Sequence, residues 1–257
     1  MEPYATADQV WAGGLIFARI GAMILTLPGI GETYVPPRIR LSLALMVSLC
    51  LWPVVGGTLP ALPDSLGATV GWVLREVITG LMIGVILRIF TSALSTAGEI
   101  VSLQTTLSFA QTANPLLGGQ NTTIAAFLML FGTVLIFATN THHLFIAGFV
   151  GSYELIAPAR PLIAADFTEL AIRTLGDSFM LGIQLSAPVI VFALIFNLAA
   201  GLVGRVMPAF QIFFAAAPLS IILGLSIFAL SLGVLGTVFI DRYRTLANLF
   251  VSGGAVG

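Results

Sequence analysis

Long apolar segments separated by short polar breaks run along the whole chain. Seven such segments lie at residues 10–30, 41–55, 68–97, 121–139, 144–157, 178–203 and 211–240. Their apolar residues are continuous and do not alternate with polar ones, as they would in the strands of a membrane barrel. Continuous runs of this length are typical of membrane-spanning helices. Because two of the segments (41–55 and 144–157) are short for a full span, we predict six to seven long helices arranged in kinked hairpins.

The composition agrees with an all-α integral membrane protein. Hydrophobic residues make up 58% of the 257 residues and charged residues only 8%, and the mean hydropathy is +1.07. A soluble chain carries about 25% charged residues, so this one cannot cover a water-facing surface. The net charge of −1 excludes a nucleic-acid binder. The first ten residues carry acids and no basic stretch, so we do not expect a cleaved signal peptide.

Charged and small residues inside the apolar segments indicate where helices meet. Arg19 lies near the middle of the first segment, and a mid-membrane arginine costs about 2.5–3.5 kcal/mol on insertion scales. We therefore expect Arg19 to face protein or water. Gly80 and Gly84 form a small-xxx-small pair that favours close contact with another helix.

The third segment also carries a polar stripe. Arg88 and Glu99 are eleven residues apart, about three helical turns, so they share a face if the helix continues. Ser92 and Ser95 lie between them. This pattern fits two arrangements: a stripe buried against a partner helix, or a stripe that faces a water-filled path.

The distribution of charge outside the apolar segments suggests a topology and a division of the chain. Arginine pairs at 38/40 and 242/244 indicate a cytoplasmic first loop and a cytoplasmic C-terminal end, with the N-terminus outside. Residues 158–177 are the most charged part of the chain. We interpret them as a charged hinge loop between an N-terminal helical part (1–157) and a C-terminal hairpin and tail (178–257).

Residues 97–120 differ from the apolar segments on either side. They contain one acid, three glutamines and no base, and they end in Asn114-Pro115 and Gly118-Gly119, which are turn signals. A polar, uncharged segment with glycines at its end either lines or plugs a path in a membrane protein.

Residues suited to catalysis are scarce. The single cysteine, Cys50, lies in an apolar run, and the two histidines, His142 and His143, are adjacent in a polar turn. No nucleotide-binding glycine loop, catalytic triad or metal-ligand spacing is present in the sequence, so we expect no enzyme activity, no metal and no cofactor. The many glycines and buried polar residues instead favour tight helix packing with other chains. Two classes remain: a subunit of a transporter or channel, and an assembly scaffold.

Three stretches of the sequence resemble a known family. They are AGEIVSLQTTLSFA at residues 97–110, NTHHL at residues 140–144, and NLAAGLVGRVMP at residues 197–208 followed by QIF and Pro218-Leu. The proline-basic loop from Pro28 to Leu45 also fits. In this order the stretches resemble the FliR family of flagellar biosynthesis proteins and its SctT-like counterparts in type III secretion injectisomes.

The resemblance implies a subunit of the type III secretion export gate in the bacterial inner (cytoplasmic) membrane, within the flagellar basal body. Such a subunit joins FliP-like and FliQ-like subunits, contacts FlhB- and FlhA-like export proteins, and helps to form the channel for unfolded flagellar export substrates. It also implies a FliP-like part followed by a FliQ-like part in one chain. The sequence of the first stretch, residues 97–110, favours a flagellar protein over an injectisome protein.

The resemblance further implies a plug at residues 105–119 that closes the pore. Its expected members are two hydrophobic stoppers, three polar or turn residues and a flexible glycine end: Leu107, Phe109, Gln111, Asn114, Pro115, Gly118 and Gly119. Static packing of these residues is the alternative. Polar contacts between subunits are expected at Arg75, Arg88, Glu99 and Gln104, and helix packing at Gly80, Gly84, Gly201 and Gly204.

Overall fold

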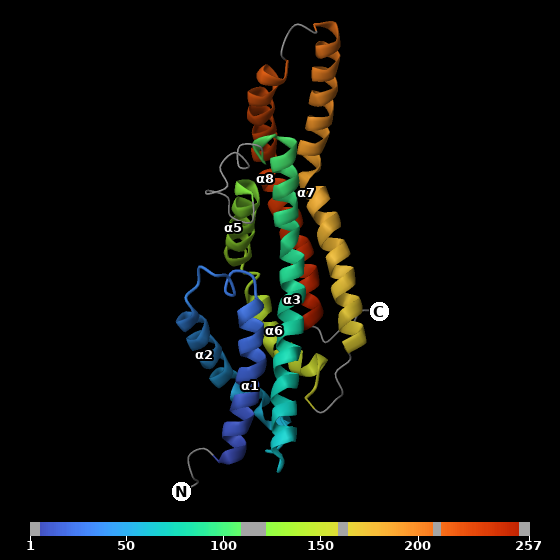
Figure 1. The fold of residues 1–257 in the computed structure, drawn as a ribbon. Helices are drawn as coiled ribbons and strands as arrows, with labels where there is room; N and C mark the ends of the chain where they lie inside the picture. Colours follow the sequence, from blue (N-terminus) through green and yellow to red (C-terminus); the bar gives the residue numbers. More distant parts are fainter. Residues whose placement is uncertain (1–5, 109–121, 159–163, 208–211, 252–257) are drawn as a thin grey trace. The chain divides into compact units, whose positions relative to one another are not determined.

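The computed structural model describes residues 6–108, 122–158, 164–207 and 212–251. These residues form seven α-helices and one short 3₁₀ helix, with no strand among them (Figure 1). The elements are α1 (Ala7–Thr26), α2 (Pro37–Val55), η1 (Gly56–Thr58), α3 (Leu66–Gln104), α5 (Thr123–Ala138), α6 (His143–Leu155), α7 (Ala164–Val206) and α8 (Ile212–Val251). The predicted all-α membrane fold is confirmed.

Five of the described helices are long and apolar enough to cross a membrane: α1, α2, α3, α7 and α8. Helices α5 and α6 together form a bent pair that counts as at most one further span. The second apolar segment, which is short for a full span, forms part of a longer helix, and whether it crosses the membrane stays a prediction. Helix α2 begins at Pro37, four residues before the apolar run, because proline at the first helical position is preorganised for a helix.

Helix α3 is longer than its apolar segment predicts. It runs for 39 residues, from Leu66 to Gln104, which is about 58 Å at 1.5 Å per residue. The polar segment that starts at residue 97 therefore begins as the last two turns of this helix. Thr105 and Thr106 follow, and Thr106 has a φ of 59°, a conformation that is unusual for a β-branched residue. Helix α3 thus ends two residues before Thr106, whose backbone lies in the left-handed region.

Helix α7 is also longer than predicted. It begins at Ala164, so residues 164–177 of the predicted hinge loop are helical. Asp166 lies in its first turn and Arg205 in its last, positions where an acid and a base interact favourably with the helix dipole. The division of the chain at this hinge stays a prediction.

The described chain separates into two compact units. The first consists of Met1–Phe90, Thr139–Thr174 and Tyr243–Gly257, and the second of Thr91–Ala138 and Leu175–Arg242. The boundaries fall inside α3, α7 and α8, so each unit is assembled from segments that are distant in the sequence.

In the first unit, α1 is the central helix. Its residues Ala12, Leu15, Ile16, Ile20 and Met23 are buried at three- and four-residue spacing along one face. The helix begins after Thr6, whose backbone N–H donates to Oε1 of Gln9 at 3.0 Å, as in a capping box. Helix α2 contacts both α1 and α6, and in Figure 1 α1 lies along the start of α3.

In the second unit, small residues set the distance between helices. A methyl group added at Gly98 of α3 would overlap the backbone of Ala125 in α5. At Gly182 of α7 it would lie 3.0 Å from Cβ of Thr96 in α3. Gly224 of α8 approaches Thr105 in the same way. The backbones are therefore close enough that only glycine fits at these contacts.

Candidate functional site

The first unit contains a buried charged cluster centred on Arg19. The guanidinium of Arg19 donates to both carboxylate oxygens of Glu76, from Nε at 2.5 Å and from Nη2 at 3.0 Å. Its Nη1 donates to the carbonyl oxygens of Ser152 at 2.9 Å and Ile156 at 3.1 Å. The ring of Tyr153 lies 4.1 Å from Cζ. Neither Arg19 nor Glu76 has any solvent-exposed side-chain surface.

The cluster joins three helices. Arg19 comes from α1, Glu76 from α3, and the two carbonyls from the end of α6. The last carbonyls of a helix have no intrahelical donor, so a buried helix end needs one from elsewhere. Arg19 provides it for the carbonyl of Ile156, and gives the carbonyl of Ser152 a second hydrogen bond beside the one from the Ile156 backbone N–H at 3.0 Å. The carboxylate of Glu76, bound by two hydrogen bonds, compensates the positive charge. The prediction that Arg19 faces protein or water is confirmed.

Two further arginines bind carbonyls on either side of α6. Nη2 of Arg75 donates to the carbonyl oxygen of Ala157 at 3.2 Å. Arg244 donates from Nη2 to the carbonyl oxygen of Thr139 at 2.8 Å and from Nε to the Thr141 hydroxyl at 3.1 Å. Asn140 between them has a φ of 58°, a left-handed conformation that asparagine tolerates. The chain is thus held by arginine both where it enters α6 and where it leaves.

Gly80 and Gly84 of α3 face α1, one and two helical turns after Glu76. A methyl group at Gly80 would overlap the carbonyl oxygen of Arg19, and one at Gly84 would overlap Oγ1 of Thr26. The close approach of the two backbones brings the Glu76 carboxylate within reach of Arg19. The small residues and the ion pair are therefore parts of one contact.

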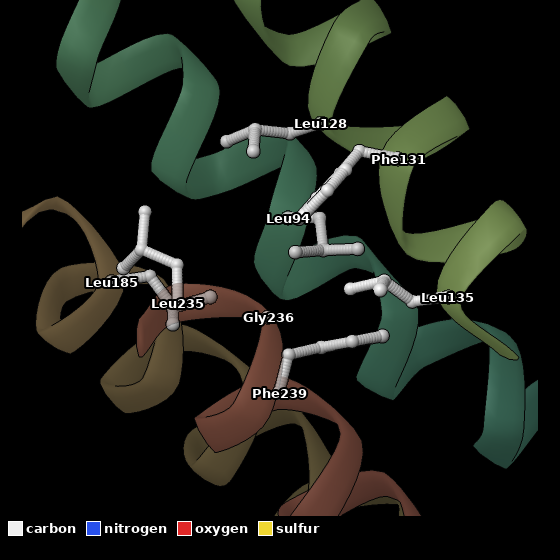
Figure 2. A pocket seen from close by; sticks show the side chains of 8 residues that line it. All are labelled: Leu94, Leu128, Phe131, Leu135, Leu185, Leu235, Gly236 and Phe239. Atoms are coloured by element: carbon white, nitrogen blue, oxygen red, sulfur yellow. The ribbon is translucent and has the colours of Figure 1, made fainter. Parts of the chain in front are cut away.

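The second unit has an apolar void rather than a polar cluster. Figure 2 shows side chains of α3, α5, α7 and α8 around it, and its lining residues are Leu94, Leu128, Phe131, Leu135, Leu185, Leu235, Gly236 and Phe239. Its volume is about 10 Å³. This is about the size of one water molecule, and an apolar void of this kind stays dry. It is a packing defect and not a ligand site.

The described residues offer little for catalysis. Arg19 and Glu76 occupy one another, which leaves no free acid or base in the cluster. No group of three or more His, Cys, Asp or Glu among the described residues could hold a metal ion. The rings of His142 and His143 lie 4.4 Å apart at the start of α6. The cluster around Arg19 holds three helices together.

Of the residues predicted to form the plug, only Leu107 lies among the described residues. It is half-buried and follows Thr106 in a short helical turn. The other predicted plug residues lie outside the described residues: Phe109, Gln111, Asn114, Pro115, Gly118 and Gly119.

The residues predicted to make polar contacts between subunits lie in different surroundings. Arg75 and Gln104 are half-buried, whereas Arg88 and Glu99 are exposed. Arg75 is already bonded to Ala157 and lies 5.3 Å from the ring of Trp72. The structure thus brings only Arg75 of the four near the buried cluster.

The Arg19–Glu76 pair was not predicted, although the sequence contains a signal for it. Ionisable residues inside membrane helices usually pair with one another. Arg19 is a base inside the first apolar segment and Glu76 an acid inside the third, 57 positions apart. The sequence contains no signal for the carbonyls of Ser152 and Ile156. Every residue has a backbone carbonyl, so nothing in the sequence distinguishes these two.

Comparison with known families gives a match over most of the chain. Residues 10–246 match the family described as bacterial export proteins, family 1. This range includes every described helix except the first residues of α1 and the last of α8.

Individual relatives cover nearly the full length. The chain is 54% identical over 250 residues to the flagellar biosynthetic protein FliR of Caulobacter vibrioides, an alignment that covers 97% of this chain and 100% of the relative. It is 30% identical over 236 residues to the protein of the same name from Escherichia coli K12, covering 90% and 88%. The corresponding Aquifex aeolicus protein is 28% identical, covering 92% and 91%.

Proposed function

This chain belongs to the FliR family of bacterial export proteins, and from that membership we propose that it is a subunit of the flagellar type III secretion export gate. It resides in the inner (cytoplasmic) membrane at the flagellar basal body. There it helps to form the channel through which unfolded flagellar proteins are exported during assembly of the flagellum. The observation that carries this proposal is the 54% identity to the Caulobacter FliR protein over its entire length.

The fold supports a membrane subunit that works by packing. Five described helices are long enough to span a bilayer, and many large apolar side chains on α7 and α8 are exposed, including Leu194, Leu198 and Leu230. Such surfaces require lipid or other membrane subunits around them. FliP-like and FliQ-like subunits are the proposed neighbours, with FlhB- and FlhA-like proteins beside them. The proposed internal order, a FliP-like part followed by a FliQ-like part, agrees with that role.

Deletion and copurification test this function together. We expect deletion of the gene in its host to abolish swimming motility and the export of flagellin, and a plasmid copy to restore both. A tagged chain purified from membranes in mild detergent should bring down FliP-like and FliQ-like subunits. Normal motility and flagellin export in the deletion strain would contradict the proposal. Loss of effector secretion with intact motility would assign the chain to an injectisome instead.

We also propose that residues 105–119 plug the closed gate, with Leu107 and Phe109 as the hydrophobic stoppers. The end of α3 at Gln104 and the left-handed Thr106 support a change of chain direction before this segment. The segment carries no charge, so it can enter an apolar constriction at low desolvation cost.

The plug is tested by conductance. Replacing residues 107–119 with a Gly-Ser linker of equal length should raise the ion leak of cells that contain the assembled gate. The replacement must leave copurification of the partner subunits unchanged for the result to refer to gating. An unchanged leak in a normally assembled gate would show that these residues pack statically.

A further inference from the structure

Glu99 is an exposed acid on the surface of the second unit. It lies five residues before the end of α3, and its side chain has no hydrogen bond or ion pair within the part of the chain that the structure describes. Residues 109–121, which follow α3 in the sequence, contain no lysine or arginine. Its charge is therefore not compensated by any described residue of its own chain.

Contacts within the second unit place Glu99 along α7. Oγ of Ser92 lies 3.3 Å from Oγ of Ser178, and Thr96 contacts Gly182. Each contact advances four residues along both helices, so α3 and α7 run in parallel here. Glu99, three residues beyond Thr96, is level with Leu185.

This level lies inside an apolar zone. No charged residue occurs in α7 between Asp177 and Arg205, and Leu185 is about 12 Å beyond Asp177 at 1.5 Å per residue. Helix α8 gives the same result, because Gly224 contacts Thr105 and its charge-free stretch extends to Ile240. The carboxylate of Glu99 therefore lies at a level where neither α7 nor α8 carries a charged residue.

The immediate surroundings of Glu99 are apolar as well. Leu103, one turn further along the same face of α3, is 63% exposed. Ser102 lies three residues after Glu99. Its buried hydroxyl has no hydrogen-bond partner among the described residues, so it does not pair with the carboxylate of Glu99. A charged carboxylate facing lipid at this depth is unfavourable, and such groups face protein or a water-filled cavity.

We propose that Glu99 forms an ion pair with a lysine or arginine on a membrane helix of a partner subunit, with Leu103 packing beside it. The inference rests on the proposed function, since it requires an assembly of membrane subunits. Charge complementarity selects the partner: an acid without a counter-charge among the described residues of its own chain is paired by a base from another one. Arg75, another residue expected between subunits, already donates to a carbonyl of its own chain, so the same argument does not apply to it.

The test compares Glu99→Leu, Glu99→Gln and Glu99→Lys with the matched control Glu169→Gln. Glu169 is an exposed acid whose only described contact is with Arg173 on the same helix. Each variant replaces the chromosomal copy in the full-length chain, and copurified subunits are quantified after mild detergent extraction. A photo-crosslinking amino acid at position 103 identifies the neighbouring helix.

We expect Glu99→Leu and Glu99→Lys to lose copurified partner about tenfold or more, because each leaves the partner's buried base without its counter-charge. Glu99→Gln should show a smaller loss, and Glu169→Gln none. Reversing the charge of the crosslinked partner residue should restore assembly of Glu99→Lys. That rescue separates an ion pair from a folding defect.

Two outcomes would overturn the inference. Wild-type copurification by Glu99→Leu would mean that Glu99 faces lipid or has no partner. Unchanged copurification of all three variants with an altered ion leak would place Glu99 in a water-filled path. In both cases the wild-type chain still assembles, so the proposed function survives. If the wild-type chain itself brings down no membrane subunit, the proposed function fails first.

Discussion

In the first compact unit, arginines donate to carbonyls at the ends of helices in addition to the close helix contact at Gly80 and Gly84, whereas in the second unit the helices described approach one another at glycines. Arg19, Arg75 and Arg244 together make hydrogen bonds on both sides of α6. The second unit depends on Gly98, Gly182 and Gly224 instead.

The difference shows two ways to fix helices in an apolar environment. Hydrogen bonds to a guanidinium are directional, so they specify one geometry for the irregular segments around α6. Contacts at glycine are steric and set only how close two helices come. A region with chain breaks needs the first method, because its free carbonyls must find donors. The continuous helices of the second unit have few such groups.

The largest expected effect comes from breaking the buried ion pair. Arg19→Leu leaves the carboxylate of Glu76 buried without a counter-charge and should lower the free energy of unfolding by about 3–5 kcal/mol. The unfolding midpoint of the purified chain in detergent should fall by at least about 6 °C. The double variant Arg19→Leu/Glu76→Leu should recover part of this loss, but not all, since the carbonyls of Ser152 and Ile156 still lose the hydrogen bonds that Arg19 donates. An unchanged midpoint for Arg19→Leu would mean that the cluster does not hold the first unit.

A methyl group in the second unit should have the next largest effect. Gly98→Ala overlaps the backbone of Ala125, which cannot move aside as a side chain can, and should cost about 1–3 kcal/mol. The control is Gly233→Ala on α8, where no atom lies within 4 Å of the added methyl. That variant should be neutral or more stable, because alanine is the better helix former. Equal midpoints for the two variants would argue against packing at Gly98.

Removing the arginine at the entry to α6 should have a smaller and more local effect. Arg244→Ala removes two hydrogen bonds from a half-buried site and should cost about 1 kcal/mol. Hydrogen exchange measured by mass spectrometry should become faster at residues 139–143, with α1 unaffected. Arg244→Lys should not fully restore the slow exchange, since a lysine ammonium cannot reproduce the planar guanidinium's hydrogen bonds to both Thr139 and Thr141. Uniformly faster exchange would indicate global loosening instead.

The smallest effect is expected at the exposed ion pair of the first unit. Arg173 and Glu169 are as close as Arg19 and Glu76, at 2.5 Å, but their side chains are 73% and 63% exposed. Arg173→Gln should therefore change stability by no more than about 0.5 kcal/mol. The midpoint measured beside that of Arg19→Leu tests whether burial, rather than distance, determines the importance of the pair. A comparable loss in both would refute that conclusion.

Much of the fold could be predicted from the sequence. The apolar segments correspond to the seven helices, because helices in an apolar environment must satisfy their backbone groups internally. The position of Arg19 within an apolar segment predicted that it faces protein or water, and the structure shows it buried against protein. Gly80 and Gly84 predicted a close helix contact, and α1 lies against both.

The helix ends could not be predicted equally well. Helix α7 includes a charged stretch that its composition suggested was a loop, and α3 continues into a polar segment. Polar residues such as Glu169 and Arg173 are compatible with a helix when they pair four positions apart. Apolar runs indicate where a helix is buried, but not where it stops.

From the sequence alone it follows that this is a helical membrane protein of the FliR family in which Arg19 faces protein or water and not lipid. The folded chain adds that Glu76 compensates the charge of Arg19 and that the carbonyls of Ser152 and Ile156, more than 130 positions away, accept its remaining hydrogen bonds. The physical reason is that hydrophobicity and helix formation are encoded locally along the chain. The partner of a buried charge depends on which distant backbones come close, and at Arg19 this depends on the absence of a side chain at Gly80.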